Sequence, residues 1–66
     1  MWDEIGQTAG RVWGYLSEHG ESPSLHIRSS LKISQSQLFL ALGWLAREGQ
    51  VDLIFRDRGY WVRLRR

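Results

Sequence analysis

The side chains of this 66-residue chain that could bind a polyanion are concentrated in its second half. Residues 32–66 hold seven basic and three acidic side chains, whereas residues 1–31 hold two basic and four acidic ones. Arginine outnumbers lysine eight to one, and the planar guanidinium group of arginine matches phosphate oxygens with two parallel hydrogen bonds. This distribution favours binding to nucleic-acid phosphates, although solvated surface and genome base composition produce similar biases.

Side chains suited to catalysis or metal binding are scattered. His19 and His26 lie seven positions apart on different predicted segments, and the chain contains no cysteine to complete a metal site. Neither a glycine-rich phosphate loop nor a Gly-x-Ser-x-Gly nucleophile elbow is present. We therefore predict that the chain is not an enzyme and has no catalytic residues, no metal site, no cofactor and no small-molecule substrate.

Two helices are predicted in the first half of the chain. The apolar residues of positions 2–19 recur at steps of three and four, which places them on one face of a helix. Gly20 can adopt the left-handed conformation that ends this helix. A short edge strand at 21–22 follows, and the proline after it is tolerated because an edge N–H need not be paired. Ser24 is then the expected cap of a second helix over 25–31.

A third helix is predicted over residues 35–48, with Ser34 as its N-cap and Gly49 as its stop. One face of this helix carries Leu38, Ala41, Leu42 and Leu45, with Phe39 and Ala46 at its margin, and together these side chains are expected to fill the core. Bases in the major groove are specified by bidentate polar side chains. The helix offers only three of these: Gln35, Gln37 and Arg47.

The residues after the third helix alternate between apolar and polar, which predicts a β-hairpin with one apolar face. The residues expected on the core side are Val51, Leu53, Phe55, Tyr60, Val62 and Leu64, and those on the outward side are Ile54, Arg56, Trp61 and Arg63. If the apolar residues of both strands face the core, the strands must be joined by a two-residue turn at Arg58-Gly59, or by a longer loop with a compensating bulge. The order of elements predicts an α+β winged helix-turn-helix fold that forms one domain over residues 1–66.

Three stretches resemble known patterns. The run Ile27–Ser34 resembles the helix-turn-helix turn, with Arg28 in place of the usual small residue and Lys32 in place of the usual glycine. The runs Ala9–Trp13 (AGRVW) and Ala41–Glu48 (ALGWLARE) resemble a family of small stand-alone winged helix-turn-helix proteins of unknown function from bacteria and archaea. This resemblance covers nearly the whole chain. It implies a winged-helix fold, a homodimer and a link to DNA, and it carries no catalytic role.

We predict that the third helix and the wing contact duplex DNA, in a homodimeric transcriptional regulator or chromosome-associated factor. The N-terminus of the helix would face the major groove, and the wing arginines would contact phosphates or the minor groove. The predicted DNA-binding residues are Ser34, Gln35, Gln37, Arg47, Arg56, Arg58 and Arg63. The alternative interpretation of the wing is a solvated hairpin with scattered charge.

A second hypothesis is a protein-interaction module that does not bind DNA. Glycines spaced four apart would form a ridge without side chains on the first helix, and each destabilises the helix by roughly 1 kcal/mol relative to alanine. The predicted interface residues are Gly6, Gly10, Gly14, Leu40, Gly43, Trp44 and Trp61. Alternatively, the glycines are merely tolerated, Trp44 folds back against the second helix or the wing, and an arginine covers Trp61 through a cation–π contact.

The size of the chain favours self-association. A domain of about 60 residues buries only about 60% of the surface that its unfolded chain exposes, and oligomerisation is a common remedy where disulfides and metals are absent. No apolar run approaches the roughly 20 residues of a membrane helix, and the acidic start at Asp3-Glu4 is unlike a secretory leader. We expect no membrane partner and a cytoplasmic location.

Overall fold

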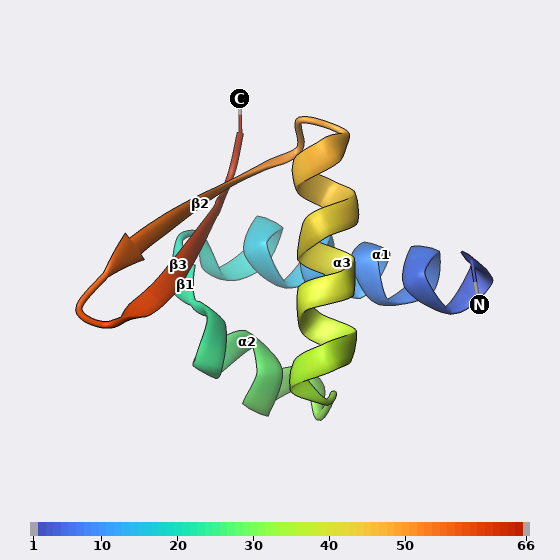
Figure 1. Ribbon diagram of the computed structural model, residues 1–66, viewed down its shortest axis with the longest axis horizontal. Coiled ribbons are helices and arrows are strands. Elements are labelled where there is room, and N and C mark those ends of the chain that lie inside the picture. Colours follow the sequence, from blue (N-terminus) through green and yellow to red (C-terminus); the bar gives the residue numbers. More distant parts are fainter. Residues whose placement is uncertain (1, 66) are drawn as a thin grey trace.

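The computed structural model describes residues 2–65, with side chains from residue 4 onward. The elements are α1 (Trp2–His19), β1 (Ser22–Pro23), α2 (Ser24–Leu31), α3 (Gln35–Arg47), β2 (Val51–Arg56) and β3 (Gly59–Leu64). Helix α3 crosses α1, and the β2–β3 wing extends from one side of α3, as Figure 1 shows. Three helices with an antiparallel sheet confirm the predicted α+β winged helix-turn-helix fold.

The core lies where α1 and α3 cross and where the base of the sheet meets them. Its buried apolar residues are Ala9, Val12, Leu16, Ile27, Ile33, Leu38, Ala41, Leu42, Leu45, Val51 and Val62. Because the four predicted core-facing residues of α3 are all in this set, the helical periodicity identified the buried face of that helix correctly.

Local capping sets the ends of the helices. The N–H of Gly20, at φ +76°, donates to the Leu16 carbonyl at 2.8 Å and ends α1 as predicted. At the start of α3 the Ser34 hydroxyl accepts from the Gln37 N–H at 3.1 Å, and the Gln37 side chain accepts from the Ser34 N–H at 2.9 Å. This reciprocal capping box satisfies two backbone donors that would otherwise be unpaired.

The start of α2 differs from the prediction, and its end shows how the turn forms without glycine. Ser24 is the first residue of α2 rather than its cap; Pro23 occupies the cap position and makes no side-chain cap hydrogen bond. Proline fits there because its φ of −69° is already extended-region geometry. At the other end Lys32 adopts the left-handed conformation, with φ 55°, that a glycine would ordinarily supply.

The sheet has the order β1-β3-β2, and both pairings are antiparallel. The turn between β2 and β3 is Asp57-Arg58, so the predicted turn at Arg58-Gly59 was wrong. A turn at 58–59 would shift every pair by two residues and place Val51 opposite the last residue of the chain, whereas in the observed register Val51 pairs with Leu64. The predicted division of side chains between the two faces of the hairpin is nevertheless correct, because a shift of two residues keeps each side chain on the same face.

The apolar face of the wing is buried only near its base. Val51 and Val62 are buried, but 66% of Phe55 and 42% of Tyr60 are exposed. The prediction that the whole face fills the core was therefore wrong. It was also wrong for Phe39, which is 36% exposed, and for Ala46, which is exposed as well, because both lie at the edge of the buried face of α3. Strands of six residues span about 20 Å, whereas a helix is only about 10–12 Å wide. The outer part of the wing consequently extends past the helices (Figure 1).

Candidate nucleic-acid interface

An open cavity of about 310 Å³ lies between α2, the N-terminal half of α3 and the tip of the wing. Its polar lining includes Arg28 from α2, Gln35 from α3 and Arg58 from the β2–β3 turn. All three of these side chains are exposed to solvent. Residues far apart in the sequence therefore meet at one surface, which we call the α2–α3–wing face.

Three local structures place the polar side chains of this face. The left-handed Lys32 reverses the chain between α2 and α3, and the Ile33 N–H donates to the Arg28 carbonyl at 3.3 Å. The capping box makes Gln35 the first residue of α3. At the wing tip Asp57 and Arg58 have φ of 56° and 64°, and two central residues with positive φ are typical of a type I′ turn.

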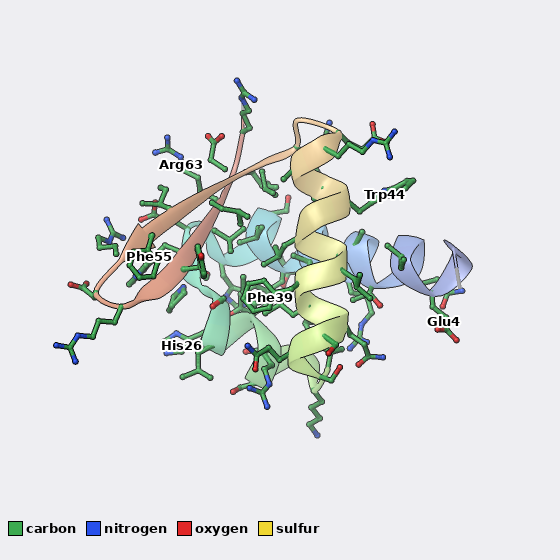
Figure 2. The ribbon with its side chains drawn as sticks, viewed as in Figure 1. Glu4, His26, Phe39, Trp44, Phe55 and Arg63 are labelled. Atoms are coloured by element: carbon green, nitrogen blue, oxygen red, sulfur yellow. The ribbon has the colours of Figure 1, made fainter. Side chains whose placement is uncertain are left out.

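Two aromatic side chains, Phe39 and Tyr60, line the cavity, and Phe55 contacts Tyr60; we call these three residues the aromatic cluster. The ring centres of Phe39 and Tyr60 are 5.9 Å apart with an interplanar angle of 77°, and those of Phe55 and Tyr60 are 5.2 Å apart at 64°. In Figure 2 Phe39 projects from α3 toward the wing, and Phe55 lies on the wing itself. Sequence analysis missed this cluster. The signal that could have revealed it is the length of the wing relative to the width of a helix.

The outer face of the sheet carries its own charge partners. Arg56 Nη2 lies 3.1 Å from Glu21 Oε2, and Arg56 Cζ lies 4.4 Å from the centre of the Trp61 ring. Arg63 Nε lies 3.5 Å from Asp52 Oδ2. Two of the predicted DNA-binding arginines therefore project from the face of the sheet opposite to the aromatic cluster, and both are in ion pairs. The cation–π contact that was one of the two interpretations of Trp61 is therefore present, and Arg56 makes it.

The predicted residues of α3 are spread along the helix. Gln35 lines the cavity, whereas Ser34 and Gln37 bond to each other in the capping box. Arg47 is in the last turn, roughly 18 Å from Gln35 at about 1.5 Å per residue. The structure thus brings Gln35 and Arg58 together, and it adds Arg28, which the sequence interpretation treated only as a departure from the helix-turn-helix pattern.

The two arginines of the α2–α3–wing face are not in ion pairs with described residues. Among residues 4–65, neither Arg28 nor Arg58 lies within 4.0 Å of a carboxylate oxygen. Lys32, in the turn between α2 and α3, also has no acidic partner in that range. Positive charge without a partner attracts anions more strongly than positive charge in ion pairs.

The predicted interface residues lie on other surfaces. A Cβ added to Gly6, Gly10 or Gly14 would have no neighbour within 4 Å, so no described segment of this chain crosses the glycine ridge. Leu40 is 56% exposed, and Gly43 is exposed as well. Trp44 is half-buried against the core, and Figure 2 places it on the side of α3 away from the wing. It therefore does not fold back onto the wing.

The part of the chain that the structure describes carries neither a metal-binding cluster nor a membrane-spanning helix. No group of three or more histidine, cysteine, aspartate or glutamate side chains is placed there to hold a metal ion. None of its helices combines the length and the apolar character needed to cross a membrane.

Residues 1–64 match the family described as winged helix-turn-helix domain (DUF2582). The chain belongs to this family. A DUF2582 domain has the winged-helix fold, which commonly binds DNA and is typically not enzymatic. The family assignment confirms the resemblance that the AGRVW and ALGWLARE motifs indicated.

Relatives of this DUF2582 domain occur in archaea and bacteria. The uncharacterized protein MJ1608 of Methanocaldococcus jannaschii is 32% identical over 68 residues, which cover 98% of this chain and 96% of that protein. The solution structure of protein BT2368 from Bacteroides thetaiotaomicron superposes with a TM-score of 0.83 at 27% identity, over 94% of this chain and 76% of that one.

A second similar structure is a complex. The Zalpha domain of PKZ from Carassius auratus, solved with Z-DNA, has a TM-score of 0.76 at 23% identity, over 86% of this chain and 92% of that domain. At this level of identity the likeness shows a shared fold.

Proposed function

We propose that this chain binds duplex DNA through the α2–α3–wing face and acts in the cytoplasm as a transcriptional regulator or chromosome-associated factor. The observation that carries the proposal is the meeting of Arg28, Gln35 and Arg58 around one open cavity, with no carboxylate of residues 4–65 paired to either arginine. The winged-helix fold and the Z-DNA complex of the similar Zalpha domain support a DNA partner in general.

The backbone at Arg58 supports a binding role for its side chain. A left-handed conformation costs a non-glycine residue roughly 1–2 kcal/mol, and Arg58 has a φ of 64°. Glycine or asparagine would occupy this turn position at lower cost. An arginine held there at an energetic cost presents its guanidinium group at the exposed tip of the wing, where it is able to contact a phosphate.

Arg28, which the structure adds, and each residue of the predicted DNA-binding set then have a proposed role. Arg28 and Arg58 contact phosphates, Gln35 contacts a base edge, and Arg47 contacts the backbone at the other end of α3. The remaining four act indirectly. Ser34 and Gln37 define the start of α3 through the capping box, and Arg56 and Arg63 hold the outer face of the wing through their ion pairs.

Salt-dependent binding tests this proposal. Fluorescence anisotropy of a short labelled duplex is measured at several salt concentrations for the parent, for an Arg28→Ala/Arg58→Ala variant and for a matched Arg63→Ala/Arg65→Ala control, whose arginines both face Asp52. Each lost phosphate contact lowers the salt slope by about 0.9. We expect a decrease of about 2 for the first variant and little change for the control. Equal weakening by both variants, or no binding by the parent at low salt, would overturn the proposal.

We also propose that the chain is a homodimer in which the exposed glycine ridge of α1 contacts a second copy. Support comes from the small size of the domain and from three glycines that no described residue of the same chain approaches. Sedimentation of a Gly10→Leu variant is compared with Glu18→Leu, an exposed change elsewhere on α1. We expect only Gly10→Leu to dissociate the dimer; a monomeric parent would contradict the proposal.

A protein-interaction module without DNA binding is the second candidate function. It is favoured by the 56% exposure of Leu40 and by the exposed Gly43 beside it on α3. On this hypothesis Leu40→Ser alters the sedimentation of the protein, and the parent does not bind duplex DNA at low salt. DNA binding that Leu40→Ser leaves unchanged favours the first function.

A further inference from the structure

The cavity of the α2–α3–wing face combines two kinds of lining that suit one ligand. Its apolar wall includes Phe39 and Tyr60, and its rim carries Arg28 and Arg58. We infer that this cavity receives a nucleotide whose base has left the helical stack, so that the chain prefers DNA with an unpaired base over an intact duplex. This inference rests on the proposed DNA-binding function and names its substrate class.

The described residues of the chain cover the aromatic cluster only in part. Burying a phenylalanine side chain is favourable by about 1.5–3 kcal/mol, and yet 36% of Phe39, 42% of Tyr60 and 66% of Phe55 are exposed. The interplanar angles of 77° and 64° show that neither ring pair is stacked face to face. A flat ligand can therefore still stack on a ring of this cluster.

An intact duplex does not provide such a ligand. In B-form DNA the faces of the bases are covered by their stacked neighbours, and a protein in a groove meets only base edges. Reading those edges requires bidentate polar side chains, and Gln35 is the only such group in the cavity besides the two arginines. Proteins that bind unstacked bases instead use aromatic rings together with basic side chains along the backbone.

The positive charge lies where the phosphates of such a nucleotide would be. Arg28 on α2 and Arg58 on the wing tip come from different elements and line the same cavity, and neither has an acidic partner among residues 4–65. Ser24, the first residue of α2, also lines the cavity, and the N-terminus of α2 has no side-chain cap. The cavity volume of about 310 Å³ is at the lower end of the range for small-ligand sites.

Three probes of one base sequence test the inference: an intact duplex, the same duplex with one additional unpaired nucleotide, and the single strand. Affinity is measured by fluorescence anisotropy at constant salt. A tenfold gain in affinity corresponds to about 1.4 kcal/mol, which lies within the range of about 1–3 kcal/mol for stacking one base on an aromatic side chain. We expect the bulged duplex and the single strand to bind about tenfold tighter than the intact duplex.

Matched variants assign the preference to the cavity. Tyr60→Leu removes a ring at the cavity, and Trp13→Leu removes an equally exposed ring on α1, 44% against 42%. We expect Tyr60→Leu to bring the affinity for bulged DNA down to that for intact duplex and to leave the intact duplex affinity unchanged, whereas Trp13→Leu changes neither. Circular dichroism verifies that both variants are folded.

The possible failures are distinguishable. Equal affinity of the parent for intact and bulged duplex overturns this inference and leaves the proposed function in place. Absence of binding to all three probes overturns both. A Tyr60→Leu variant with unchanged DNA preference but altered sedimentation overturns the inference as well, because the aromatic cluster is then a protein contact.

Discussion

The guanidinium carbon of Arg56 lies 4.4 Å from the centre of the Trp61 ring on the neighbouring strand. The same guanidinium group forms an ion pair with Glu21, at 3.1 Å, and so joins β2 to the segment that precedes β1. The outer face of the sheet is thus occupied by interactions within the chain. The inner face and the tip of the wing are the parts that remain available to a partner.

Arg56→Ala is expected to lower stability without weakening DNA binding. An exposed cation–π contact contributes about 0.5–1 kcal/mol, and a surface ion pair about 0–1 kcal/mol. A loss of about 1 kcal/mol lowers the melting temperature by about 4–8 °C in a domain of this size. Thermal unfolding followed by circular dichroism measures it, with the longer ion pair of Arg63 as control in Arg63→Ala. An unchanged melting temperature together with weakened DNA binding would contradict this account of Arg56.

Arg58→Gly is expected to stabilise the protein and to weaken its binding to DNA. The substitution relieves the positive φ of 64° at the wing tip, and relief at such a position is worth about 1 kcal/mol. Urea unfolding measures the stability and anisotropy the affinity. Asp57→Gly is the matched control, because it relieves a φ of 56° one residue earlier without removing a positive charge. If both variants bind DNA as the parent does, Arg58 is not a DNA contact.

Ser34→Ala is expected to destabilise the protein by about 1 kcal/mol, because it removes the N-cap acceptor of α3. Gln37→Ala removes the reciprocal bond of the capping box, which measures 2.9 Å. A double-mutant cycle by urea unfolding should show that the two losses are coupled. Strictly additive losses would mean that the two bonds form independently.

Gly10→Ala is expected to stabilise the monomer by about 1 kcal/mol, because α1 gains a better helix former and the added Cβ meets nothing within 4 Å. Gly20→Ala is the opposite case, since a φ of +76° is unfavourable for alanine. Unfolding is followed at low and high protein concentration. If Gly10→Ala raises the free energy of unfolding at low but not at high protein concentration, a second copy is in close contact with the glycine ridge. An increase that is the same at both concentrations argues against such a contact.

Much of the fold could be predicted from local patterns. The helical spacing located α1 and the buried face of α3, and the capping residues Gly20 and Ser34 were identified because their hydrogen bonds reach only three or four residues along the chain. The alternation after Gly49 correctly separated the two faces of the wing, since side chains on a strand point alternately to opposite sides. The hairpin turn was misplaced because two non-glycine residues adopt positive φ there.

The candidate site depended instead on contacts between distant segments. Periodicity assigned Phe55 and Tyr60 to the correct face, but whether helices cover that face depends on where the wing is held. That position is set by long-range pairing, in which Pro23 of β1 lies opposite Trp61 of β3. The same arrangement brings Arg28 and Arg58 to one cavity and places Arg56 on the opposite face of the sheet. Interactions between residues that are close in the sequence are enough to specify most of the helices and strands. The charged and aromatic side chains come together in one cavity only when those helices and strands pack against one another.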